Sequence, residues 1–417
     1  MKRGVLFIVL VSLGCFLPAQ GRTAPAGTGE NIDWIFEGGG ETGEDPDGKD
    51  DILGGTVKQS RVTLAAEYNF FGGFSPGWTE PPWYSDGKFN YILGAKMEAL
   101  LSLDFQITEH LRVWNAFYFS IPDSSVFSIK EFYFDYDISS VFFLRAGQYE
   151  INWGISTNYP YTNLPARIPA ESARGNSYIA KADLPIGIGG LQFLIMTRQG
   201  FMEDQASPKI DEFAYGAKYN LALQRADIDM GFFYFWNMPM RFFTSLKTTI
   251  GDTELYAEAL AAAPYKAPEE LSFSGSAGFL RDFFGSKITL NGEIFYNGEK
   301  GLMWYWRAKA DIRDAEASPF IEGWNAAANV IIRPGVLGMR IFCRCLYALD
   351  ANSVQLAPGI SLKPGNLLTF SLTVPMVLGS RESGYYRHNM DTENRPFSIV
   401  LAASLSGSFN HKFILDN

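Results

Sequence analysis

The stretch KFNYILGAKMEALLSLDF, residues 88–105, alternates along its length between apolar odd-numbered positions and mostly polar even-numbered ones. A strict period of two predicts a β-strand with one apolar and one wet face. The stretch is longer than a globular strand, which usually has about five or six residues. It reaches the about nine to eleven residues that a tilted strand needs to cross a bilayer. The sequence therefore predicts a membrane-spanning β-strand.

The amino terminus has the features of a secretory signal peptide over residues 1–21. Lys2 and Arg3 supply positive charge, Val5–Leu13 supply a short apolar run, and Ala19-Gln20-Gly21 supplies a small-x-small cleavage site. The segment ending at Cys15, SLGC, resembles a lipobox with two positions exchanged. Lipidation of Cys15 therefore remains an alternative to cleavage after Gly21.

Residues 22–55 are predicted to form a disordered periplasmic leader, because this segment is rich in glycine and acidic side chains. Its DPDGKDD run is dense in oxygen ligands but lacks the spacing of an EF-hand, so no calcium site is predicted. The remainder, residues 56–417, is predicted to be one outer-membrane β-barrel.

Composition supports a β-barrel over a helical membrane protein. Mean hydropathy is only −0.04, whereas aromatic residues make up 15% of the chain, which suits side chains facing lipid and headgroups. Loss of Lys2 and Arg3 with the signal peptide leaves 33 basic against 45 acidic residues, a net charge of −12. No basic cluster indicates a nucleic-acid partner.

The alternation returns along the chain, and we place eighteen strands in it. They predict an all-β, transmembrane antiparallel up-and-down β-barrel of about 16–18 strands. The strand number could be as low as about 14, because some segments are weak, and Leu302–Ala310 could form a further strand. The segments are Val57–Phe70, Lys88–Gln106, His110–Ile121, Val126–Ile138, Val141–Trp153, Ser177–Leu184, Leu191–Arg198, Glu212–Leu223, Ala226–Asn237, Phe242–Ile250, Thr253–Ala261, Leu271–Arg281, Lys287–Asn297, Phe320–Arg333, Val336–Leu349, Val354–Lys363, Leu367–Val377 and Pro396–Phe409.

The connections between these segments mostly alternate between long and short. Tight turns such as GDT and KPGN follow the even-numbered strands, and long loops such as LGSRESGYYRHNMDTEN follow many of the odd-numbered ones. Bacterial barrels have short periplasmic turns and long external loops. An even strand count then puts both termini in the periplasm.

In this arrangement the chain resembles bacterial outer-membrane porins from about Val57 onward. The segment LRAGQYEINWG, Leu144–Gly154, is similar to an Arg-x-Gly-Gln…Trp-Gly stretch of some proteobacterial and spirochaetal porin-like families. The resemblance implies a channel in the outer membrane that is inserted by the barrel-assembly machinery. The chain departs from the pattern at its carboxyl end, where Phe413 is followed by four further residues instead of closing the chain.

The polar face of each strand is predicted to line a lumen, because an Arg or Lys on the lipid face costs about 2–4 kcal/mol at the midplane. Arg340 and Arg344 share a face, and with Arg112 and Arg145 they could form an arginine ladder that attracts anionic solutes. Structural ion pairs across neighbouring strands are the alternative. The pore-lining candidates are Lys96, Glu98, Arg112, Arg145, Arg340 and Arg344.

The loop after Trp153 is the candidate constriction. Several prolines stiffen it, and Arg167, Glu171 and Arg174 would bring charge wherever it folds. A position outside the barrel, shielding the rim, is the alternative.

The sequence gives little support to an enzyme. Only His110, His388 and His411 could act as an imidazole base, and none has a nucleophile specifically paired with it. Cys343 and Cys345 lie two apart in a strand, a spacing that suits a disulfide poorly. No metal site or cofactor is predicted.

The predicted function is passive diffusion of small hydrophilic solutes across the outer membrane, and the alternatives are a channel for hydrophobic substrates or an adhesin or structural barrel. The predicted partners are outer-membrane lipid, small solutes and the assembly machinery, and the sequence leaves the oligomeric state open.

Overall fold

A computed structural model describes residues 60–78, 88–121, 127–138, 141–165, 177–197, 213–235, 239–263, 271–299, 321–379 and 396–415. The predicted signal peptide, the acidic leader and the possible strand at Leu302–Ala310 lie outside these residues.

The described residues form twenty strand segments in one antiparallel sheet. They are β1 (Ser60–Trp78), β2 (Phe89–Gln106), β3 (Leu111–Ile121), β4 (Phe127–Ile138), β5 (Phe142–Gln148), β6 (Tyr178–Ile186), β7 (Gly189–Thr197), β8 (Phe213–Leu223), β9 (Ala226–Phe235), β10 (Met240–Ile250), β11 (Thr253–Ala263), β12 (Ser272–Phe283), β13 (Ile288–Asn297), β14 (Gly323–Ile332), β15 (Arg340–Ala348), β16 (Ser353–Leu362), β17 (Leu368–Thr373), β18 (Met376–Gly379), β19 (Phe397–Ser398) and β20 (Val400–Leu415).

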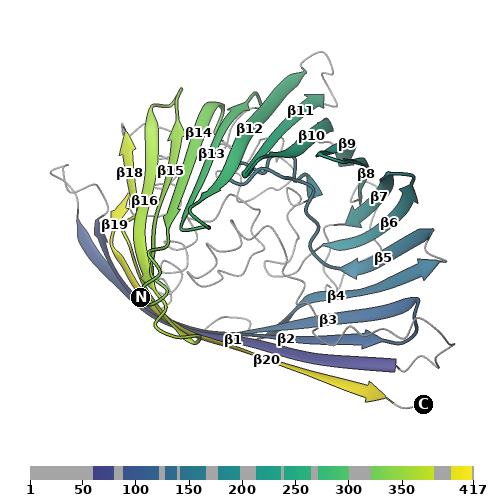
Figure 1. Ribbon diagram of the computed structural model, residues 1–417, viewed down its shortest axis with the longest axis horizontal. Coiled ribbons are helices and arrows are strands. Elements are labelled where there is room, and N and C mark those ends of the chain that lie inside the picture. Colours follow the sequence, from purple (N-terminus) through teal and green to yellow (C-terminus); the bar gives the residue numbers. More distant parts are fainter. Residues whose placement is uncertain are drawn as a thin grey trace.

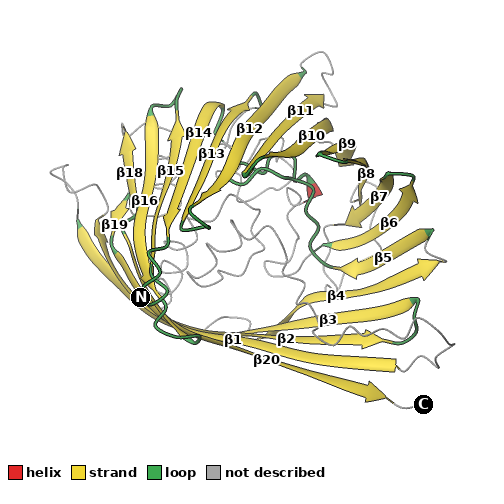
Figure 2. Ribbon diagram, in the orientation of Figure 1, coloured by secondary structure: helices red, strands yellow, loops and turns green. Residues whose placement is uncertain are grey.

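The sheet closes on itself because β1 pairs with β2 on one side and with β20 on the other. β17 and β18 both pair with β16 and are the two parts of one strand, interrupted at Val374-Pro375. β19 and β20 are likewise separated only by Ile399. The wall is therefore an 18-strand antiparallel barrel (Figure 1), and Figure 2 shows how completely strands dominate the described chain. The predicted fold and strand number are confirmed.

Eight tight turns lie at one end of this barrel. They connect each even-numbered strand to the next one along the chain, from β2–β3 to β16–β17. The start of β1 and the end of β20 lie at the same end, because Ser60 is opposite Leu415 and Arg61 is opposite Gln106. The predicted tight turns at one end, with both ends of the barrel sequence beside them, are confirmed. The opposite end has mostly longer connections, but it also has a short turn between Ala348 of β15 and Ser353 of β16.

The register separates an apolar outer face from a polar inner face. On β2 the outward positions Tyr91, Leu93 and Met97 are exposed, whereas Glu98 and Ser102 on the other face are buried. Large exposed hydrophobic side chains recur on nearly every wall strand, as expected for a surface in contact with lipid. No helix among the described residues is long and apolar enough to cross a bilayer.

The three largest differences from the predicted strand ends are in β1, β20 and β5. β1 continues to Trp78 because it is paired along its whole length, with Phe89 on one side and Phe397 on the other. β20 runs on to Leu415. The segment Val141–Trp153 is wrong as a single strand, because β5 ends at Gln148.

Candidate functional site

After β5 the chain leaves the wall and enters the barrel. Gly147, the last residue but one of β5, has φ of 143°, and a Cβ there would lie 2.1 Å from the carbonyl oxygen of Phe132 on β4. Glycine permits this close approach of two backbones. The residues that follow, 149–165, form what we call the inward segment, which runs inside the ring towards β11 and β12 (Figure 1).

Two carboxylates of the wall hold the backbone of the inward segment. Glu258 on β11 accepts hydrogen bonds from the backbone N–H groups of Ile155 at 2.6 Å and Ser156 at 3.1 Å. Glu293 on β13 accepts hydrogen bonds from the backbone N–H groups of Asn158 at 2.9 Å and Tyr159 at 3.2 Å. Both glutamates are buried. They therefore satisfy buried backbone donors that have no partner in a strand ladder.

Side chains extend these contacts to neighbouring strands. Asn158 donates to Asn291 on β13 at 2.6 Å and accepts from Asn329 on β14 at 2.7 Å. The hydroxyls of Ser156 and Ser276 lie 2.7 Å apart. The inward segment is thus hydrogen-bonded to four consecutive strands, β11–β14.

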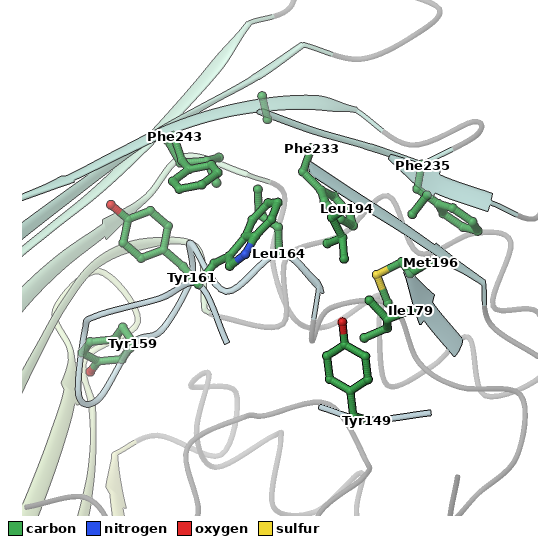
Figure 3. Packing of buried hydrophobic residues seen from close by; sticks show 14 of the residues in the cluster. Tyr149, Tyr159, Tyr161, Leu164, Ile179, Leu194, Met196, Phe233, Phe235 and Phe243 are labelled. Carbon is green, nitrogen blue, oxygen red and sulfur yellow. The ribbon is translucent and has the colours of Figure 1, made fainter. Parts of the chain in front are cut away.

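Aromatic side chains of the inward segment and side chains of the wall together form the largest buried cluster of the molecule's described part (Figure 3). Trp153 packs against Phe233 and Phe243 with ring centroids 6.0 and 5.6 Å apart, and its indole N–H donates to Gln192. Tyr159 stacks on Phe295 at 4.9 Å. Such pairs add to the free energy gained by burying the rings. The cluster fills the lumen beside β6–β11, where a water-filled barrel would be open.

Two of the predicted pore-lining residues lie in a row of charges near the turn end. Arg112 on β3 makes a bidentate ion pair with Asp104 at 2.8 and 3.0 Å, and Arg145 on β5 makes one with Asp135 at 2.6 and 2.9 Å. The Arg145 guanidinium also lies 4.4 Å from the ring centroid of Tyr133. Its partners therefore fix its position on the inner wall.

Arg145 also faces the start of the inward segment. Its guanidinium lies 5.5 Å from the ring centroid of Tyr149, which is 3% exposed. Burial raises the pKa of the Tyr149 hydroxyl above its ordinary value, so this hydroxyl stays protonated at neutral pH.

The other predicted residues lie on different strands. Lys96 and Glu98 form an ion pair with each other on the inner face of β2. Arg340 and Arg344 are on the inner face of β15, opposite Ser361 and Ala357 of β16.

The structure does not assemble all four arginines into one ladder, because β3 and β5 are on the other side of the ring from β15 (Figure 1). Arg112 and Arg145 lie in one region of the wall and Arg340 and Arg344 lie in another, with several strands between the two regions. Arg167, Glu171 and Arg174 lie outside the described residues.

Sequence reasoning missed the residues that position the inward segment. Glu293, Glu258 and Asn158 are not among the predicted pore-lining residues. The wall residues and the residues of the inward segment that they contact are 102 to 171 positions apart in the chain, so no local sequence pattern could have paired them. Within the described residues no group of His, Cys, Asp and Glu has the arrangement of a metal site.

The fold is that of known bacterial porins. The chain aligns with OccK3 (OpdO) of Pseudomonas aeruginosa at a TM-score of 0.54 and 11% identity, over 84% of this chain and 96% of that one. It aligns with OccD3 (OpdP) of the same organism at 0.54 and 12%, over 85% and 92%. A BenF-like porin from Pseudomonas fluorescens Pf-5 aligns at 0.52 and 11%, over 86% and 100%.

No protein-family model matches the chain, and no curated protein matches it by sequence. The likeness is therefore one of three-dimensional structure, and it extends over nearly the whole length of those porins. The chain shares with them a closed antiparallel barrel.

Proposed function

We propose that this protein is a porin-like channel in the bacterial outer membrane that allows small hydrophilic solutes to diffuse passively. One observation carries the proposal: a closed 18-strand wall has an apolar outer face and a charged inner face, including Arg112 and Arg145. Charged side chains on the inner face require water or ion pairs there, because lipid would exclude them. The porins of the same fold support this reading.

The route of the solute follows from the position of the inward segment. Because this segment occupies the lumen beside β6–β14, we place the route along the remaining arc of the wall, from β15 through β20 and β1 to β5. Arg340 and Arg344 line this arc on one side, and Lys96, Glu98 and Arg112 line it on the other. Arg145 lies at its edge, beside Tyr149 of the inward segment.

The inward segment supplies the constriction in this proposal. Its described part is held against the wall by Glu258 and Glu293. We propose that Arg167, Glu171 and Arg174, which follow it in the chain, contribute charge to the narrow region. The proposal assigns the protein no enzymatic activity, and it includes the barrel-assembly machinery as the partner that inserts the barrel.

Conductance across a planar lipid bilayer tests the function. Purified protein should produce discrete current steps, and Arg344→Glu should shift the reversal potential in a salt gradient towards cation preference, because a lumen charge changes the local ion concentration. Ile341→Ala is the matched control, since Ile341 is on the same strand but faces outward. A folded barrel that carries no current would contradict the proposal and favour an adhesin or a structural barrel. Equal reversal potentials for the wild type and Arg344→Glu would remove Arg344 from the route.

A further inference from the structure

The turn end of the barrel has an unusual surface. Each of its eight tight turns has at least one exposed large hydrophobic side chain in the turn or next to it. These residues are Ile107, Val141, Ile188, Leu223, Ile250, Phe284, Leu337 and Leu367. The exposed fraction of Phe284 reaches 77% and that of Ile250 reaches 65%. Exposed apolar side chains therefore recur at every turn and form what we call the rim, in which exposed charged residues such as Glu109, Arg225 and Asp252 lie between them. A recurring exposed apolar surface marks an interaction surface.

The rim is continuous with the lipid-facing wall. Leu223 and Ile250 are the last residues of β8 and β10 and occupy the outward positions of those strands. The apolar outer face therefore reaches the turns, where exposed charged side chains such as Arg225 and Asp252 accompany the apolar ones. Continuity with a surface in contact with lipid identifies lipid as the occupant of the rim.

A single cation interrupts this apolar surface. Among the described wall residues that the register places on the outer face, Arg281 is the only Lys, Arg, Asp or Glu. Its outward neighbours across the sheet are Thr253 and Leu290. An arginine on the lipid face of a barrel costs about 2–4 kcal/mol at the midplane and about 0–1 kcal/mol near the interface. Arg281 is therefore expected to reach the headgroup region.

The direction of its side chain agrees with this expectation. The Arg281 guanidinium lies 4.8 Å from the ring centroid of Phe283, two residues closer to the turn. Long cationic side chains in membranes extend their heads towards the interface in this way. The guanidinium thus points towards the turn, to the level of the Phe283 ring. It presents five donors that match a phosphate.

We propose that the rim of turns is embedded in the interfacial region of the inner leaflet and that Arg281 binds the phosphate of a phospholipid there. This inference rests on the outer-membrane location proposed above. The apolar turn residues contact the acyl chains and the glycerol region, and Phe283 holds the guanidinium at the height of the headgroups.

Native mass spectrometry of the full chain, with phosphatidylglycerol as the probe, tests the phosphate site. Arg281→Gln should lower lipid retention about tenfold, the loss expected for one charge-assisted hydrogen bond, and Arg281→Lys should restore part of it. Lys247→Gln is the matched control, because it also removes one positive charge, but from the inner face, where Lys247 pairs with Glu254. Equal retention by the wild type and Arg281→Gln would overturn the site. Displacement of the lipid by inorganic phosphate alone would show a free anion site instead.

Spin labels test the embedding of the rim. In a background of Cys343→Ala and Cys345→Ala, a label at Leu337→Cys in phosphatidylethanolamine–phosphatidylglycerol vesicles should collide more with oxygen than with a nickel chelate. Ser408→Cys, on the inner face of β20, is the aqueous control. If the label at position 337 is as accessible to the nickel chelate as the label at position 408, the rim is not embedded in lipid. That result would overturn the proposal and favour a protein partner for the rim. Heat-modifiable gel migration of the same samples reports separately whether the barrel has inserted. A rim that is not embedded is therefore distinguishable from a protein that is not in the membrane.

Discussion

Glu293→Ala should release the inward segment from the wall. The Glu293 carboxylate is buried and accepts the backbone N–H groups of Asn158 and Tyr159, in addition to the hydroxyl of Tyr256 at 3.0 Å. Alanine removes the acceptor and leaves both backbone donors without a partner in the docked position. In the released segment, water can accept these hydrogen bonds. The substitution therefore disfavours the docked state selectively.

The size of the effect follows from those two donors. Each buried donor left without an acceptor costs about 1–3 kcal/mol, so the docked state loses about 2–6 kcal/mol. Since about 1.4 kcal/mol is a factor of ten, the ratio of docked to released segment should fall at least about thirtyfold. In single-channel recordings we expect larger conductance or frequent transitions to a larger open level. Glu293→Gln keeps one acceptor oxygen and should give a smaller effect.

Glu254→Ala is the control for this experiment, because Glu254 is a carboxylate on the inner face of β11 that pairs with Lys247. It should leave the frequency of the larger level unchanged. If Glu293→Ala folds and gives the conductance and noise of the wild type, the two hydrogen bonds do not hold the constriction and the reasoning is refuted.

Three further predictions concern the barrel itself. The protein should migrate differently on gels before and after boiling, because a closed barrel with paired backbone groups resists detergent until it is heated; identical migration together with recovery in the soluble periplasmic fraction would argue against a membrane barrel. A protease-sensitive tag near Ser383, between β18 and β19, should be cleaved on intact cells, whereas one at Gly251 in the turn between β10 and β11 should be protected; the reverse pattern would invert the topology. Gly147→Ala should reduce the yield of folded barrel, since its Cβ would lie 2.1 Å from a backbone oxygen, and Gly187→Ala, where φ is 60° but no atom lies within 4 Å of the new Cβ, should have a smaller effect; equal yields would show that the close approach at Gly147 relaxes without cost.

The wall was largely predictable because its information is local. The alternation of residues 88–105 and the turns between strands depend on neighbouring residues, and both are reproduced in β2 and the turn end of the barrel. The predicted continuation of the strand to Trp153 was wrong for a physical reason. Tyr149, Ile151 and Trp153 keep an alternating pattern, but they bury their side chains inside the barrel instead of extending the wall.

The grouping of the arginines shows a second limit. A period of two indicates the face of a strand, and Arg340 and Arg344 share the inner face of β15 as predicted. It does not indicate how far apart two strands lie around a closed ring. Arg112 and Arg145 have aspartate partners on adjacent strands, which a pattern within one strand cannot reveal.

The contacts of the inward segment also constrain the order of assembly. Asn158 reaches Asn329, 171 residues further along the chain, and Ile155 reaches Glu258 after 103 residues. Contacts at such separations form late, because the loop between them must first be closed. β11–β14 must be in place before the segment can dock on them. The pairing of β1 with β20, which closes the wall, joins residues that are still farther apart in the chain, such as Ser60 and Leu415. By the same argument the segment can dock on β11–β14 before the wall closes, so the barrel closes around a lumen that is already narrowed.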